Sequence, residues 1–105
     1  MKRLSFTVSA FARLDEIYAF SVDRFGRRKA EAYHDTLIRA CRHLCSGQKS
    51  SQSCRALFSG LLRADLRFAR TGRHFVIFID LESEIRVIDV VHQSANVLRC
   101  LEKLT

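Results

Sequence analysis

The pattern of hydrophobic and polar positions in the first part of the chain predicts a strand followed by a helix. Residues 4–8 alternate between apolar and polar side chains, the period of a half-buried strand. Ser9 then offers a hydroxyl for the N-cap of a helix, and Gly26 ends the pattern. Between them, apolar residues recur at steps of three and four: Phe11, Leu14, Tyr18, Val22 and Phe25. We therefore expect an amphipathic helix that buries this stripe.

A second helix is predicted almost immediately after the first. Its apolar residues again follow the helical spacing and stop before Gly47: Ala30, Tyr33, Leu37, Cys41 and Leu44. Two amphipathic helices joined by a short glycine turn form an antiparallel hairpin. Both stripes are too apolar to remain in water, so a third surface must cover them.

The remainder of the chain changes to the pattern of strands. Residues 48–53 are polar and serine-rich and are expected to form a loop. Strands are predicted at 64–70, 73–80 and 84–91, joined by short turns and therefore antiparallel. Residues 95–104 are expected to form a short terminal helix or arm.

This order of elements predicts an α+β fold, β-α-α-β-β-β, in a single domain over residues 1–105. The strand at 73–80 is apolar on both faces around Val76–Phe78, as in a central strand covered on two sides. The first strand most easily joins the edge of the later three. We expect one antiparallel sheet packed against the N-terminal helical hairpin.

The composition is that of a globular protein, with 48% hydrophobic and 28% charged residues among 105. The longest apolar run, Phe75–Ile79, is far shorter than the ~20 residues that cross a membrane. The basic residues Lys2 and Arg3 are not followed by the apolar stretch of a signal peptide. We expect a cytosolic protein that does not interact with membranes.

The formal net charge of the chain is +7, which favours an anionic partner. Four of these charges fall within residues 55–73, which contain one acid, Asp65. The five arginines of this segment are Arg55, Arg63, Arg67, Arg70 and Arg73. Guanidinium groups bind carboxylates or phosphates through two parallel hydrogen bonds, so the segment can grip an acidic peptide or a phosphate. The alternative is a solvated face without a ligand.

Two residues of the last strand also carry candidate chemistry. His92 ends the strand, where a histidine can act as a general acid or base, although a structural role is favoured because the sequence shows no partner. Asp89 lies between Val87 and Val91 on one predicted face. If buried, its carboxylate needs a cation, and an arginine of the 55–73 segment is the expected one.

Other catalytic and metal chemistry has little support in the sequence. The motifs of nucleophilic enzymes and phosphate-binding loops are missing, so neither a catalytic residue nor a cofactor is expected. Cys41 and Cys45 lie one helical turn apart, but His43 points away from their shared face, which argues against zinc. We expect four reduced thiols, with Cys41 at least buried as a small hydrophobe: Cys41, Cys45, Cys54 and Cys100.

Several motifs in this order resemble the ParE branch of the ParE/RelE toxin superfamily over nearly the whole chain. They are Ala12–Tyr18, Arg24–Gly26, Ala30–Tyr33, Gly60–Leu61, Gly72–Phe78 and Ile88–His92. The resemblance implies the toxin of a type II toxin–antitoxin pair, neutralised by an acidic ParD-like antitoxin. It also implies inhibition of DNA gyrase through protein contact, without catalysis.

RelE-like relatives instead cleave messenger RNA on the ribosome, using a basic cluster and a tyrosine near the last strand. Here the two tyrosines, Tyr18 and Tyr33, are predicted on the core stripes of the helices, which favours gyrase inhibition. A ribonuclease, or an inactive relative that retains only antitoxin binding, remains the alternative. Direct sequence-specific binding to nucleic acid is not expected. The residues expected to meet the antitoxin or target are Arg63, Arg67, Arg70, Arg73 and His92.

Overall fold

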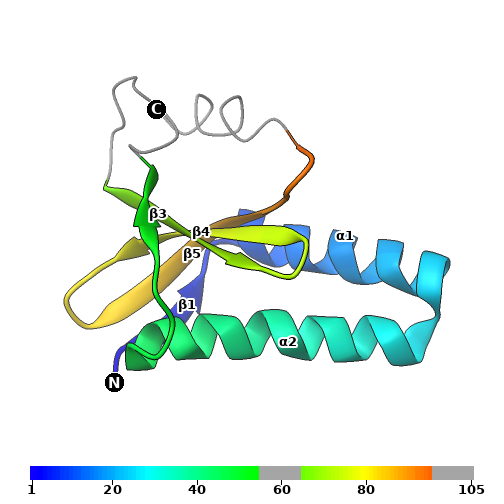
Figure 1. The fold of residues 1–105 in the computed structure, drawn as a ribbon, viewed down its shortest axis with the longest axis horizontal. Helices are drawn as coiled ribbons and strands as arrows, with labels where there is room; N and C mark the ends of the chain where they lie inside the picture. The colour runs from blue at the N-terminus through cyan, green and yellow to red at the C-terminus, as the bar shows by residue number, and fades with distance from the viewer. Residues whose placement is uncertain (55–64, 96–105) are drawn as a thin grey trace.

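The computed structural model describes residues 1–54 and 65–95, and it confirms the predicted α+β class. Two helices lie side by side against one face of a sheet, and their far ends extend beyond it (Figure 1). In chain order the elements are β1 (Arg3–Phe6), α1 (Val8–Phe25), α2 (Arg27–Ser46), β2 (Gln52–Ser53), β3 (Leu66–Thr71), β4 (His74–Asp80) and β5 (Glu84–His92). The terminal helix or arm predicted at residues 95–104 lies largely outside the described part of the chain.

The sheet has the strand order β1-β5-β4-β3-β2. Strands β3, β4 and β5 form the predicted antiparallel meander. The expectation of a wholly antiparallel sheet is wrong, because β1 runs parallel to β5 from Arg3 opposite Glu84 to Phe6 opposite Val87. The helical hairpin returns the chain to the start of β1, where the Lys2 N–H donates to the Cys45 carbonyl. The two turns of the meander then leave β5 starting from that same end.

Two boundaries also differ from the sequence prediction. Residues 52–53 were expected in a loop but form β2, paired with Phe68 and Arg67 of β3. The N-cap of α1 is Thr7 rather than Ser9, because the Thr7 hydroxyl accepts from the Ala10 N–H at 3.1 Å. The same hydroxyl donates to the Ile88 carbonyl at 3.1 Å, which ties the start of the helix to β5.

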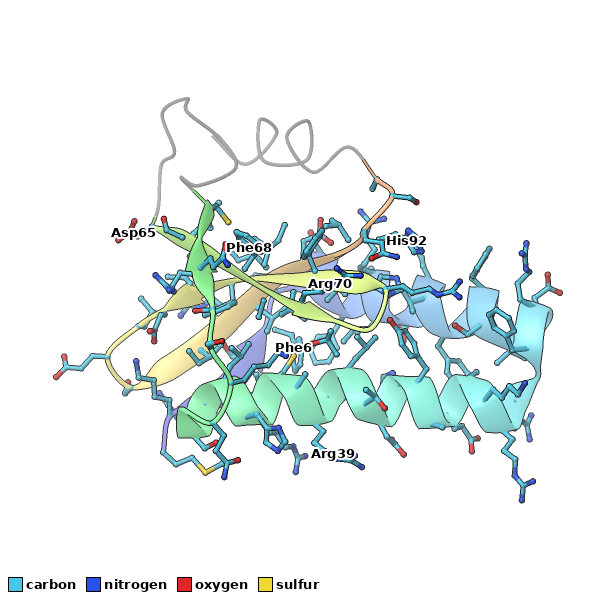
Figure 2. All side chains as sticks on the ribbon, in the orientation of Figure 1. Phe6, Arg39, Asp65, Phe68, Arg70 and His92 are labelled. Carbon is cyan, nitrogen blue, oxygen red and sulfur yellow. The ribbon has the colours of Figure 1, made fainter. Side chains whose placement is uncertain are left out.

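The core lies between the helices and the sheet. The stripe predicted for α2 is confirmed, with Leu37 and Cys41 each at most 2% exposed. The stripe predicted for α1 is partly wrong, because Phe11 and Phe25 are exposed while Ala10 and Leu14 face the core. Figure 2 shows Phe6 between the sheet and the helices and Phe68 on the opposite side of the sheet.

Strand β4 is central and covered on both faces, as predicted from its sequence. Val76 and Phe78 pack in the cluster that includes the helices, whereas Ile77 packs in a second cluster with Leu66 and Phe68. All three β4 residues are at most 1% exposed. Within the described residues, neither helix is long and apolar enough to span a bilayer.

Strand β5 contains a bulge that changes which residues share a face. The sums of paired residue numbers shift by one between Phe78–Val87 and Ile77–Asp89, so Ile88 is the extra residue. Val87 therefore packs with the helices, but Val91 packs in the other cluster. The prediction that Val87, Asp89 and Val91 share one face is wrong for this reason.

Candidate functional site

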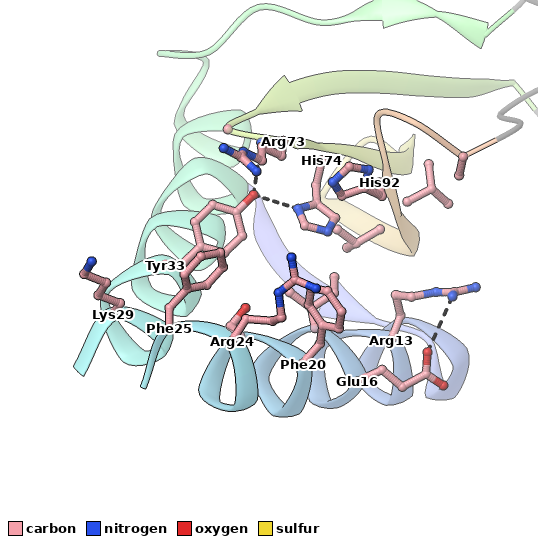
Figure 3. A pocket seen from close by; sticks show the side chains of 16 residues that line it. Arg13, Glu16, Phe20, Arg24, Phe25, Lys29, Tyr33, Arg73, His74 and His92 are labelled. Carbon is pink, nitrogen blue, oxygen red and sulfur yellow. Dashed lines mark hydrogen bonds and ion pairs between the residues drawn. The ribbon is translucent and has the colours of Figure 1, made fainter. Parts of the chain in front are cut away.

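A groove of about 920 Å³ opens where the far ends of the helices meet the end of the sheet (Figure 3). Its walls come from α1, the start of α2, the β3–β4 turn and the end of β5. The lining residues are Arg13, Glu16, Ile17, Phe20, Ser21, Arg24, Phe25, Lys29, Tyr33, Gly72, Arg73, His74, Val90, Val91, His92 and Ala95. The groove therefore joins segments that are far apart in the sequence.

The groove combines exposed aromatic rings with cationic side chains. Phe20 and Phe25 of α1 are 60% and 54% exposed, whereas Phe78 in the core is 1% exposed. The Arg24 guanidinium lies 5.4 Å from the centre of the Phe20 ring, a cation–π distance. Within residues 1–54 and 65–95, the side chains of Arg24, Lys29 and Arg73 form no ion pair.

One acidic residue, Glu16, lines the groove, and it is already paired. Arg13 lies 3.5 Å from the Glu16 carboxylate, and its Nε donates to Asp89 at 3.1 Å. The Asp89 carboxylate also accepts from the Val90 N–H at 2.8 Å. The expected cation for Asp89 was an arginine of residues 55–73, so this prediction is wrong. Arg13 reaches Asp89 because Thr7, at the start of α1, anchors this helix beside β5.

At the inner end of the groove, the Tyr33 hydroxyl joins α2 to the β3–β4 turn. It lies 2.6 Å from His74 Nδ1 and accepts from the Arg73 N–H at 3.1 Å. The Tyr33 ring also packs closely on Gly72, where an added Cβ would lie 2.9 Å from the ring. A tyrosine buried along its ring and hydrogen-bonded at its tip fixes the position of this turn.

His74 faces His92 across strands β4 and β5, with their ring centres 5.2 Å apart. Burial, and to a lesser extent the nearby His92, together lower the pKa of His74 from its ordinary value of 6.5 to about 4. His74 is therefore neutral at pH 7. His92 is exposed, and its Nδ1 accepts from the Ser94 N–H at 3.0 Å. The hydrogen bonds of the described residues therefore engage Nδ1 and not Nε2.

The structure brings two of the predicted site residues together and places two others elsewhere. Arg73 and His92 line the groove. Arg67 instead donates to the hydroxyl and carbonyl of Ser51 at 2.8 and 2.9 Å, which anchors the segment before β2. Arg70, three residues further along β3, faces the other side of the sheet and donates to Gln93 at 2.6 Å. Arg63 lies outside the described residues.

Sequence reasoning missed Tyr33 and His74 as groove residues. Tyr33 was placed on the core stripe, although a tyrosine there needs a partner for its hydroxyl, and this need was the available signal. Without the bulge at Ile88, His74 would lie opposite Val91 instead of His92. No pattern in the sequence marks that bulge, so the histidine pair had no comparable signal.

The three cysteines that the structure describes lie apart from the groove, and Cys100 lies outside the described residues. Cys41, Cys45 and Cys54 are free and buried, and burial raises the pKa of Cys41 to about 12 and that of Cys54 to about 11. The prediction of a buried, hydrophobic role for Cys41 is confirmed. Among the described residues, no three His, Cys, Asp or Glu side chains are placed to hold a metal ion.

Comparison with protein families gives a result that covers most of the chain. The family described as "ParE toxin of type II toxin-antitoxin system, parDE" matches residues 4–97. The chain belongs to the ParE toxin family. This match confirms the resemblance drawn from the sequence motifs.

Structural comparison agrees on the fold of this ParE-family chain. A solved structure described as "Chromosomal ParDE TA system from P. aeruginosa" is similar to it, with a TM-score of 0.68 and 20% sequence identity. The similarity covers 88% of this chain and 96% of the other. At this identity the likeness supports the fold alone. No curated protein matches the sequence.

Proposed function

We propose that this ParE-family chain is a single-domain cytosolic toxin, neutralised by an acidic antitoxin that binds in the groove. The observation that carries the proposal is the pairing of exposed Phe20 and Phe25 with Arg24, Lys29 and Arg73. A partner segment with apolar side chains along one side and carboxylates beside them complements both features. A disordered acidic segment gains this complementarity when it folds on binding.

The charges of the groove also predict how such a partner is recognised. Arg24, Lys29 and Arg73 have no carboxylate partner among the described residues, so a partner's acids can engage them without breaking an ion pair. Rim charges of this kind mainly speed association and lose their effect in salt. We therefore place specificity in the aromatic rings and salt dependence in the three cations.

Binding of the cognate antitoxin, sought as the product of a reading frame adjacent to that of this chain, tests this proposal. We expect Arg73→Ala to weaken its affinity about three- to tenfold at low salt and to reduce the salt dependence. Arg70→Ala is the matched control, because Arg70 is also exposed but donates to Gln93 outside the groove. Equal effects of the two substitutions would contradict binding in the groove.

We propose DNA gyrase as the toxin's target, inhibited by protein contact and without catalysis by this chain. The family membership supports this proposal, because the resemblance to the ParE branch implies it. Purified gyrase should lose supercoiling activity when the chain is added and regain it when the antitoxin follows. Undiminished supercoiling at excess toxin would contradict the gyrase target.

A second candidate, a ribosome-dependent ribonuclease, is favoured by one observation in the groove. The sequence predicts Tyr33 on a core stripe, yet its hydroxyl lies 2.6 Å from His74, which faces His92. His92 has an unbonded Nε2 among the described residues and lies with Arg73 on one groove, as general acid–base chemistry on a phosphodiester requires.

Translation assays distinguish the two candidates. If the chain is a ribonuclease, messages should be cleaved during translation, and this cleavage should be lost in His92→Gln. Supercoiling by gyrase should then be unaffected by the chain. Gyrase inhibition predicts intact messages in the same assay. An inactive relative would bind the antitoxin but would neither inhibit gyrase nor cleave messages.

A further inference from the structure

A second, smaller cleft lies on the other side of the contact between Tyr33 and β3. Its volume is about 350 Å³, and it is bounded by the later half of α2, the segment after α2 and the end of β3. The polar residues that line it are Thr36, Arg39, His43, Gln48, Lys49 and Thr71. Arg39 extends from the exposed side of α2 (Figure 2). None of these residues lines the groove.

The chemistry of this cleft is one-sided. Arg39 and Lys49 contribute fixed positive charge, and within residues 1–54 and 65–95 neither forms an ion pair. The amide of Gln48 and the ring of His43 add further N–H donors. No carboxylate lines the cleft. A set of donors without an acid matches an oxyanion, because each donor can then bond to an oxygen of the ligand.

A buried hydroxyl on the wall of the cleft supports the same assignment independently. Thr71 is 8% exposed, and its Oγ1 has no hydrogen-bond partner in the described residues. A buried polar group without a partner costs ~1–3 kcal/mol, so such groups call for an explanation in a bound water or ligand. Thr71 lines the same cleft as Lys49 and Arg39, and an oxygen of an anion bound there would supply the acceptor that its hydroxyl lacks.

The end of α2 would oppose an anion, because the C-terminus of a helix carries partial negative charge. Here hydrogen bonds to a carbonyl of the last turn offset part of that charge. The His43 carbonyl accepts from the N–H groups of Gln48 at 2.9 Å and Lys49 at 3.2 Å, and from the Ser46 hydroxyl at 3.2 Å. The same bonds hold Gln48 and Lys49 beside the helix, and so set the donors in place.

We propose that this cleft binds a phosphate group. The proposal is independent of the antitoxin groove, and it holds for either target of the toxin. A free phosphate ion and the phosphate of a nucleic acid present the same oxygens to Arg39, Lys49 and Thr71, so the experiment separates these sources.

The test is a titration of the purified full chain with inorganic phosphate, followed by the backbone amide NMR shifts of Gln48, Lys49 and Thr71. Sodium chloride at equal ionic strength is the salt control. We expect saturable shifts at these amides and a loss of affinity of about three- to tenfold in Arg39→Ala and in Lys49→Ala. Arg42→Ala is the matched control, since Arg42 is an exposed arginine of α2 that does not line the cleft.

A short single-stranded oligonucleotide, with and without a 5′-phosphate, then identifies the source. Tighter binding of the 5′-phosphorylated form assigns a terminal phosphate, and equal binding tighter than inorganic phosphate assigns the backbone. Two results would overturn the proposal. One is a response to phosphate that sodium chloride reproduces, and the other is an equal loss of affinity in Arg42→Ala and Arg39→Ala.

Discussion

The same helices build two unlike regions against the sheet, a closed core and an open groove. In the core, Leu14 and Leu37 meet Val76 and Phe78 and exclude water. Towards the far end, α1 and α2 extend beyond the sheet (Figure 1), and Phe20 remains 60% exposed. The helices pack tightly on the sheet where apolar side chains face each other. They leave a groove where Tyr33 contacts His74 and the β3–β4 turn. The core therefore carries stability, and the groove is the surface that we propose for recognition.

The largest expected difference between the two regions comes from removing a phenylalanine from the core. Phe78 is 1% exposed, and Phe78→Ala should lower the free energy of unfolding by about 3–5 kcal/mol through lost burial and a cavity. Urea unfolding followed by circular dichroism measures this loss. A cost below about 1 kcal/mol would mean that the core closes less tightly than the contacts indicate.

The junction between the regions is tested by Gly72→Ala. Gly72 has φ of +58°, and a Cβ there would lie 2.9 Å from the Tyr33 ring, so we expect a cost of about 2 kcal/mol. Gly47→Ala is the matched control, because Gly47 has φ of +78° but nothing within 4 Å of a Cβ. Equal costs in urea unfolding would show that the turn does not press on Tyr33.

Acid should weaken the junction through His74. The unfolded chain binds a proton near pH 6.5, whereas folded His74 binds one only near pH 4. The free energy of unfolding should therefore fall as pH drops from 6.5 towards 4, and not further below pH 4. The full shift corresponds to about 3 kcal/mol, which solvent screening of the partly exposed ring reduces to about 2 kcal/mol. His74→Gln should flatten this part of the stability profile. A profile that stays equally steep in His74→Gln would contradict the burial of a neutral His74.

The smallest effect on folding is expected in the groove. Because Phe20 is mostly exposed, Phe20→Ala should change the free energy of unfolding by no more than about 0.5 kcal/mol. Its contact with Arg24 accounts for part of this value. A loss above about 2 kcal/mol would place Phe20 in the core and remove the contrast between the two regions.

The closed region was largely predictable from the sequence, because its signal is local. The spacing of Leu37 and Cys41 defines one helix face, and the unbroken run around Ile77 defines a central strand. The same rule predicts too wide a buried face for α1, because Phe11 and Phe25 follow the helical period but lie beside the buried face. Periodicity locates an apolar side of a helix more reliably than the residues at its margins.

The groove was not predictable in the same way, because its geometry depends on events that leave no local pattern. The bulge at Ile88 sets His92 opposite His74, and the hydroxyl of Tyr33 meets a turn that lies about 40 residues away in the chain. Arginines that cluster in the sequence do not all share one surface in the fold. Alternation along β3 sends Arg67 and Arg70 to opposite faces, and each is held by neighbouring polar groups.

The central claim, that the groove receives the acidic antitoxin, is tested most directly by the antitoxin's affinity for two phenylalanine variants of α1. Phe20 lines the groove, whereas Phe11, 56% exposed on the same helix, packs beside Phe6 outside it. By isothermal titration calorimetry we expect Phe20→Ala to weaken binding at least about tenfold and Phe11→Ala to change it less than about twofold. An unchanged affinity in Phe20→Ala, or a larger loss in Phe11→Ala, would contradict the claim.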